Sequence, residues 1–302
     1  MSQFDVLQSL FALTILVLLF GEGCCKLKKR IVGGRKCRIP TEFAVAIVDK
    51  SLTIRCGGAL LDHRWVVTAA QCCTPEIEYV LAGTPTISWA TLEKAAKTKI
   101  RKCIPHEDYK PEGLLNNIAL IFLDKAVAQS DYVKYVSLPH AQLPDDILNW
   151  YPKCSVMGWG AISFSYAGSK SKAIRCALLE VAPSKDCSKV YKGMSESIVC
   201  IHTNTSAACG VDAGGPLVCQ NVLYGIASYS GACERGVPGV YARVDTYLAF
   251  IIPHILREAD SNVLHQAISV IVLACVHIAL FLYSVVIWFP YTRFTFDNKY
   301  MN

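Results

Sequence analysis

The hydrophobic positions of this 302-residue chain form two long apolar runs near its ends and many short runs between them. The long runs cover residues 9–20 and 267–289. Between them, short β-branched and aromatic runs alternate with Gly, Pro, Asn and Ser, which is typical of an all-β sandwich or barrel. Val244–Leu256 instead has helical spacing. Strands are predicted at Phe43–Val48, Trp65–Thr68, Ile118–Phe122, Cys154–Met157, Leu217–Cys219, Val222–Tyr229 and Val240–Val244.

The N-terminal run is too short to span the hydrocarbon core of a bilayer, which is about 30 Å thick. It suits the core of a signal peptide, and the small residues Gly21 and Gly23 follow it as a cleavage site requires. The segment before the run holds Asp5 and no Lys or Arg. An uncleaved N-terminal anchor therefore stays open as an alternative.

The C-terminal run contains no Asp, Glu, Lys or Arg and is long enough to cross a membrane. Its residues would form a helix about 35 Å long at about 1.5 Å per residue. A lipid-anchor signal ends in its hydrophobic tail, whereas residues 290–302 follow this run, so we expect a retained span. Arg293 and Lys299 beyond it fit a cytoplasmic C-terminus. The expected topology is single-pass type I, with the main domain extracellular or luminal.

Composition narrows the class of the middle domain. Hydrophobic residues make up 53% of the chain, which argues against a disordered protein. The net charge of +6 divides into +2 up to Arg30, +4 over residues 31–256 and zero after them, so we expect no nucleic-acid partner. Fifteen cysteines behind an apolar leader indicate an oxidising compartment.

Six short motifs occur in a fixed order along the middle of the chain. They are Lys28–Gly34 (KKRIVGG), Trp65–Cys72 (WVVTAAQC), Asn117–Ile121 (NIALI), Gly158–Gly160 (GWG), Cys209–Cys219 (CGVDAGGPLVC) and Pro238–Tyr241 (PGVY). In this order and spacing they resemble the trypsin/chymotrypsin-like serine proteases (peptidase S1) over residues 31–256. The resemblance implies two packed six-stranded antiparallel β-barrels that meet near residues 136–150, followed by a C-terminal helix.

The two apolar runs and the resemblance together give the expected domain organisation, and the resemblance gives the disulfides. The segments are a signal peptide (1–23), a short propeptide (24–30), the protease-like domain (31–256), a juxtamembrane linker (257–266), a transmembrane helix (267–289) and a cytoplasmic tail (290–302). Cys24 and Cys25 lie at the signal boundary, and Cys275 lies in the span. The family's pairings, with a sixth bridge proposed for the last pair, are Cys37–Cys176, Cys56–Cys72, Cys154–Cys219, Cys187–Cys200, Cys209–Cys233 and Cys73–Cys103.

The three positions that correspond to the family's catalytic triad hold Gln71, Asn117 and Ala213. The chemistry needs an imidazole base, a carboxylate that orients it and a hydroxyl nucleophile. A glutamine amide is not basic near neutral pH, asparagine carries no charge, and alanine has no nucleophilic atom. Val211 stands where the family places an oxyanion-hole glycine, and its β-branched side chain tolerates glycine-type backbone angles poorly.

The substrate pocket and the activation switch follow from the same resemblance. The pocket floor is Ala207 with Ala208 beside it, so no carboxylate is present to hold a Lys or Arg side chain. Ser230 would narrow the entrance, where Gly239 keeps the other wall open. Asn204 begins a glycosylation sequon in the same loop. Cleavage after Arg30 would free Ile31 to pair with Asp212, the family's activation switch.

The sequence therefore predicts an inactive, membrane-tethered serine protease homologue that binds a protein partner and needs no cofactor or metal. The histidines that could replace the lost base, His63, His106 and His202, are expected at loop positions without a nucleophile beside them. Two alternatives stay open. One is residual or unconventional serine-type hydrolysis, and the other is a chaperone-like role in assembling another membrane protein.

Overall fold

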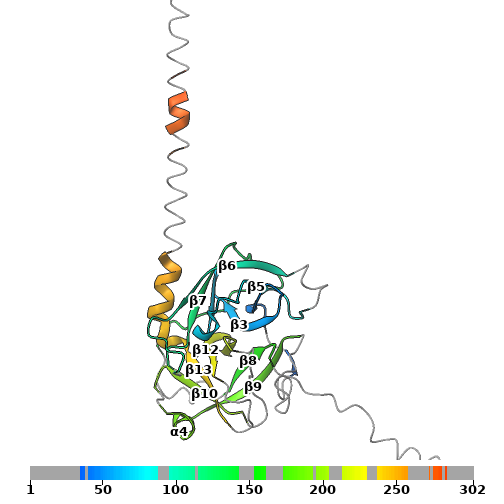
Figure 1. Ribbon diagram of the computed structural model, residues 1–302, viewed down its shortest axis with the longest axis vertical. Helices are drawn as coiled ribbons and strands as arrows, with labels where there is room; N and C mark the ends of the chain where they lie inside the picture. Colours follow the sequence, from blue (N-terminus) through cyan, green and yellow to red (C-terminus); the bar gives the residue numbers. More distant parts are fainter. Residues whose placement is uncertain are drawn as a thin grey trace, which may run out of the picture.

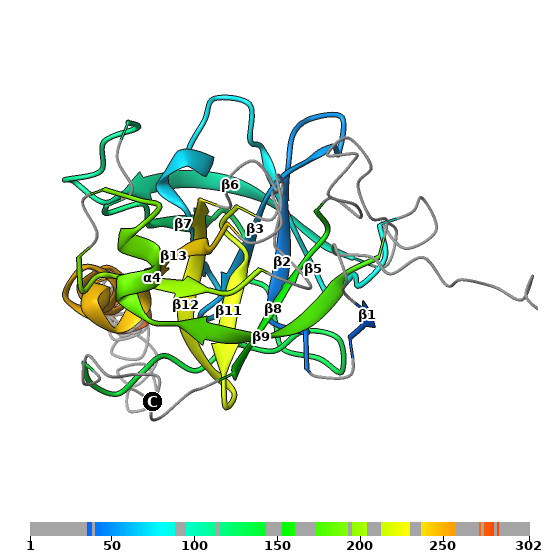
Figure 2. The ribbon, with the colours of Figure 1, turned by 90° about the horizontal axis from the view of Figure 1, so that it is seen from below.

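A computed structural model describes residues 35–37, 40–87, 95–112, 115–142, 153–160, 173–192, 195–203, 213–229, 237–257, 272, 275–280 and 283. The predicted signal peptide and propeptide lie outside these residues, as do the boundaries predicted at residues 266 and 289. Within the described ranges, the chain forms two β-barrels and a C-terminal helix (Figures 1 and 2).

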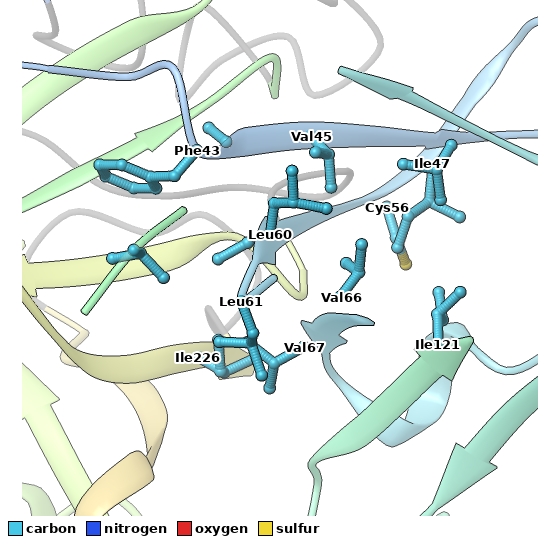
Figure 3. Close-up of a cluster of buried hydrophobic side chains, with 14 of the residues drawn as sticks. Phe43, Val45, Ile47, Cys56, Leu60, Leu61, Val66, Val67, Ile121 and Ile226 are labelled. Carbon is cyan, nitrogen blue, oxygen red and sulfur yellow. The ribbon is translucent and has the colours of Figure 1, made fainter. Parts of the chain in front are cut away.

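The first barrel closes in the order β2-β3-β4-β7-β6-β5. Its strands β2, β4 and β7 are buried along their whole length, because the side chains on one face fill the barrel and those on the other face are covered. Figure 3 shows the interior side chains of Val45, Ile47, Leu60, Val66 and Ile121. The strands are β2 (Ala44–Val48), β3 (Ile54–Leu60), β4 (Trp65–Thr68), β5 (Tyr79–Ala82), β6 (Ala96–Pro105) and β7 (Ala119–Leu123).

The second barrel is a sheet in the order β1-β9-β10-β13-β12-β11-β8, in which β8 also pairs with β9 and so closes a ring of six strands. The short strand β1 (Arg35–Lys36) lies outside this ring and pairs with β9. The ring consists of β8 (Lys153–Gly158), β9 (Arg175–Ala182), β10 (Ile198–Ile201), β11 (Pro216–Cys219), β12 (Val222–Tyr229) and β13 (Gly239–Arg243).

The chain crosses from one barrel to the other at Val136 and Ser137. The Val136 amide donates to the Leu60 carbonyl of the first barrel at 3.0 Å, and the Leu223 amide of the second donates to the Ser137 carbonyl at 2.9 Å. This agrees with the predicted meeting point, of which residues 143–150 lie outside the described part. One buried cluster contains side chains of both barrels, among them Phe43 and Ile226.

Helical segments are few among the described residues of the domain. They are the 3₁₀ turns η1 (Ala70–Cys72) and η3 (Val244–Tyr247), the helix α4 (Ser184–Ser188) and an α-helix over residues 248–257, and residues 272, 275–280 and 283 further along the chain are also helical. The predicted helix Val244–Leu256 is therefore confirmed as a 3₁₀ turn that continues into an α-helix. No helix within the described residues is both long enough and apolar enough to cross a bilayer. Most of the predicted span lies outside those residues.

Five of the six predicted disulfides are present. They are Cys37–Cys176, Cys56–Cys72, Cys73–Cys103, Cys154–Cys219 and Cys187–Cys200. The partners of the sixth, Cys209 and Cys233, lie outside the described residues. Disulfides persist in oxidising environments, so the domain belongs to the extracellular space or the secretory pathway.

The turn between β2 and β3 is organised by one buried carboxylate. Asp49 accepts hydrogen bonds from the amides of Ser51 and Thr53, each at 2.9 Å, and from the Ser51 hydroxyl at 2.7 Å. Arg55 Nη2 lies 2.8 Å from Asp49 Oδ2. The Ser51 hydroxyl and these further donors stabilise the charged form and lower the pKa of Asp49 to about 2, although burial opposes the shift.

Candidate functional site

Asn117 lies at the centre of a hydrogen-bonded network between the two barrels. It precedes β7 of the first barrel and is 3% exposed, and its partner Ser228 in β12 of the second barrel is 2% exposed. Asn117 Oδ1 accepts the Gln71 backbone amide at 3.0 Å, which fixes the orientation of the side-chain amide. Its Nδ2 donates to Gln71 Oε1 at 2.8 Å and to Ser228 Oγ at 2.9 Å. Both donor hydrogens of Asn117 are therefore used.

Gln71 sits in η1, and two disulfide-bonded cysteines follow it directly. Cys72 is bonded to Cys56 in β3, and Cys73 is bonded to Cys103 in β6. The Gln71 side chain is exposed at the surface while its Oε1 accepts the Asn117 amide. An amide carries no basic nitrogen, so this arrangement orients Gln71 but cannot accept a proton.

Ala213 lies at the entry to β11 and is bound to the first barrel through its backbone. The Gly57 amide donates to the Ala213 carbonyl at 2.9 Å, and Gly57 follows Cys56, which is bridged to the neighbour of Gln71. The structure therefore places positions 71, 117 and 213 on connected elements at the junction of the barrels. None of the three side chains supplies a nucleophile, a base or a charge.

The backbone beside Ala213 is tightly constrained. Gly214 has a φ of +79°, and a Cβ added there would overlap the Thr68 hydroxyl and the Gly57 carbonyl. The Gly214 amide donates to the Ala227 carbonyl at 2.7 Å, which attaches this segment to β12. The glycine is thus required both by its left-handed backbone and by the space around it.

The histidines considered as replacement bases lie elsewhere. His63 is exposed in the turn before β4, and the His106 ring packs at 5.4 Å from Tyr247 and 5.0 Å from Phe250. The His202 amide donates to the Glu180 carbonyl at the end of β10. Among the described residues, none of the three has a recorded hydrogen bond or ring contact with Gln71, Asn117 or Ala213. No group of three His, Cys, Asp or Glu in this part of the chain is arranged for a metal ion.

Of the remaining predicted site residues, Gly239 lies in the described part of the chain and the others lie outside it. Gly239 opens β13, where an added Cβ would lie 3.4 Å from Tyr241 Cε2 and 3.7 Å from Thr203 Cγ2, so the position is not crowded. The others lie outside the described residues: Val211, Ala207, Ala208, Ser230, Asn204, Arg30, Ile31 and Asp212. The sequence interpretation missed Ser228, although a single serine in the apolar stretch Val222–Tyr229 was a visible signal.

Comparison with known proteins gives consistent matches. The family model described as Trypsin matches residues 31–251. Trypsin-1 of Salmo salar is 31% identical over 234 residues, which are 76% of this chain and 93% of that protein. Trypsin-4 of Rattus norvegicus is 32% identical over 228 residues, 74% of this chain and 88% of that protein. The solved structure of mouse neuropsin, a serine protease, matches with a TM-score of 0.65 at 29% identity, covering 74% of this chain and 98% of neuropsin.

Proposed function

The chain belongs to the trypsin family of serine proteases, and from this premise we propose that it is an inactive member that acts by binding another protein. The observation that carries the proposal is the amide network at the barrel junction. Asn117 uses both donor hydrogens on Gln71 and Ser228, and the adjoining position is Ala213. The three positions that would need a base, a carboxylate and a hydroxyl hold two neutral amides and a methyl group.

These replacements remove the reaction's proton transfer and its nucleophile together. Loss of a complete triad costs on the order of a millionfold in rate. Val211 adds to this, because a misaimed oxyanion donor costs about 3 kcal/mol of transition-state stabilisation. Residual hydrolysis would need another base and nucleophile, and the ring of His106, the considered histidine whose backbone bonds next to Asn117, packs instead on Tyr247 and Phe250.

The frame around the inactive site supports a binding role. Both barrels are closed, five disulfides hold them, and the network at the junction is satisfied rather than strained. Loops on such a rigid frame can recognise a partner without chemistry. We place the binding surface on the loops around Gln71 and Ala213.

The proposal includes tethering to a membrane by residues 267–289, after removal of a signal peptide over 1–23. The described helical residues in that region expose large apolar side chains, among them Val272 at 56%, Ile278 at 60% and Leu280 at 61%. A helix that is apolar on its surface requires an apolar environment. Resistance of the full chain to alkaline carbonate extraction would support the tether, and release into the supernatant would contradict it.

A fluorophosphonate probe of serine hydrolases tests the loss of activity directly. The full chain should not be labelled, while a trypsin at the same concentration is labelled fully. Labelling of this chain that an active-site competitor abolishes would overturn the proposal and favour unconventional hydrolysis.

A further inference from the structure

The outer face of β6 carries a row of cations that the overall composition hides. Along this ten-residue strand, Lys97, Lys99, Arg101 and Lys102 are all exposed, while Thr98 between them is buried. The first three alternate outward, about 7 Å apart at about 3.4 Å per residue. The register shifts between Ile100 and Lys102, so the bulge exposes two successive cations. Figure 1 shows β6 at the rim of the first barrel.

Aromatic rings lie beneath two of these cations, and Arg64, just before β4, shares one of the rings. Arg101 Cζ is 5.9 Å and Arg64 Cζ is 4.4 Å from the centroid of the Phe122 ring, and Lys97 Nζ is 4.9 Å from that of Tyr79. Phe122 is only 6% exposed. The rings hold the cations over the barrel wall by cation–π attraction; Phe122 is covered, whereas Tyr79 is half-buried.

Little of this positive charge is neutralised within the molecule. Among the described residues, Glu78 alone has a carboxylate within 4.0 Å of any of the four β6 cations. It lies 4.0 Å from Lys99 Nζ and also contacts Lys50 Nζ at 3.8 Å. A ligand with a row of negative groups would therefore gain charge-assisted contacts at Lys97, Arg101 and Lys102 without displacing an ion pair, and would compete with Glu78 only at Lys99.

The chemistry of the face selects among polyanions. A protein partner would be expected to bury an aromatic or apolar anchor, but the large exposed hydrophobic side chains of the described residues lie outside β5, β6 and β7. Single-stranded nucleic acid would need a series of exposed rings for stacking, whereas Phe122 is covered and the half-buried Tyr79 already lies beneath Lys97. The disulfides place the domain where sulfated polysaccharides occur. We propose that the β6 face binds a linear sulfated polysaccharide of the glycosaminoglycan class.

Heparin is the probe for this proposal. The full chain, purified in detergent, should bind fluorescent heparin at 150 mM salt with an affinity that falls steeply as salt rises, because binding releases counterions. The variant K97Q/K99Q/R101Q/K102Q should bind at least about tenfold more weakly, with a shallower salt dependence. Near-UV circular dichroism and the thermal midpoint would verify that the variant is folded. If that variant unfolds, the pair K97Q/K99Q replaces it, with a loss of at least about threefold expected.

The matched control is K153Q/K185Q/K189Q/K192Q, which removes the same charge from exposed positions of the second barrel. It should bind heparin within about twofold of the unmodified chain. Equal losses in both variants would show that net charge alone drives binding and would overturn the proposal. Equal affinity for fully desulfated heparin, for duplex DNA or for an acidic peptide would likewise overturn the assignment to a sulfated polysaccharide.

Discussion

Asn117 Nδ2 donates to Ser228 Oγ at 2.9 Å, and this bond joins the two barrels at a point that neither side chain exposes to solvent. It stands at the position where the family uses a carboxylate to orient a base. Here Asn117 at that position instead helps to hold the two barrels together. The predictions below separate that structural role from catalysis.

Replacing Ser228 by Ala should lower the free energy of unfolding by about 1–3 kcal/mol, because one buried hydrogen of Asn117 loses its acceptor. Urea unfolding followed by tryptophan fluorescence measures the change. Ser195→Ala is the matched control, since Ser195 is exposed and its hydroxyl bonds to the hydroxyl and the backbone amide of Ser197. Equal small effects in both variants would mean that the buried bond contributes nothing.

Repair of the triad by Q71H/N117D/A213S should restore only weak labelling by a fluorophosphonate probe. The cause is Val211, which disfavours the backbone needed for one oxyanion donor. Adding V211G should raise labelling by roughly a hundredfold, the usual value of one such donor. The control N117D/A213S, which lacks a base, should stay unlabelled. If V211G leaves the repaired chain unchanged, the backbone argument fails.

Gly214→Ala should prevent the native structure from forming or should destabilise it severely. Its φ of +79° and the overlap of a Cβ with Thr68 and Gly57 both oppose a side chain. Gly239→Ala is the control, because the nearest atom would lie at 3.4 Å, an ordinary contact. Secretion yield and thermal unfolding of the two variants should differ sharply. Similar midpoints would contradict the described backbone.

Acid should weaken the β2–β3 turn through Asp49. Its folded pKa of about 2 lies below the usual value of about 3.9, so its stabilising contribution is fully present above about pH 4. That contribution is lost as the pH falls through about 2. Compared with Asp49→Asn, the native chain should be more stable at pH 6, and the difference should shrink between pH 4 and pH 2. A difference independent of pH would exclude this role for the carboxylate.

The sequence predicted strands best where apolar residues fill both faces. The predictions for Trp65–Thr68 and Val222–Tyr229 agree with β4 and β12 to the residue, and most others shift by one. The strands it named did not include β1, β3, β5, β6, β9 or β10. In β6 four of the ten side chains are charged, and the bulge at Arg101 breaks the alternation on which strand recognition depends.

The same limit applies to the sites. Motif order located Gln71, Asn117 and Ala213, because each lies within a recognisable family signature. It could not reveal Ser228 as their partner, since the contact joins residues 111 apart in sequence. The charged residues looked evenly spread along the sequence. In the fold, however, the four basic residues of β6 lie together on its exposed face.

Two consecutive cysteines fasten one turn to two different strands. Cys72 bonds η1 to β3 and Cys73 bonds the end of the same turn to β6, so the turn that carries Gln71 is fixed to two strands. The surface around Gln71 is therefore preorganised, so a partner that binds there does not have to order a flexible loop at a cost in conformational entropy. The Cys73–Cys103 disulfide also joins this turn covalently to β6. A polysaccharide bound to β6 would therefore contact a strand that is covalently joined to the proposed protein-binding surface around Gln71.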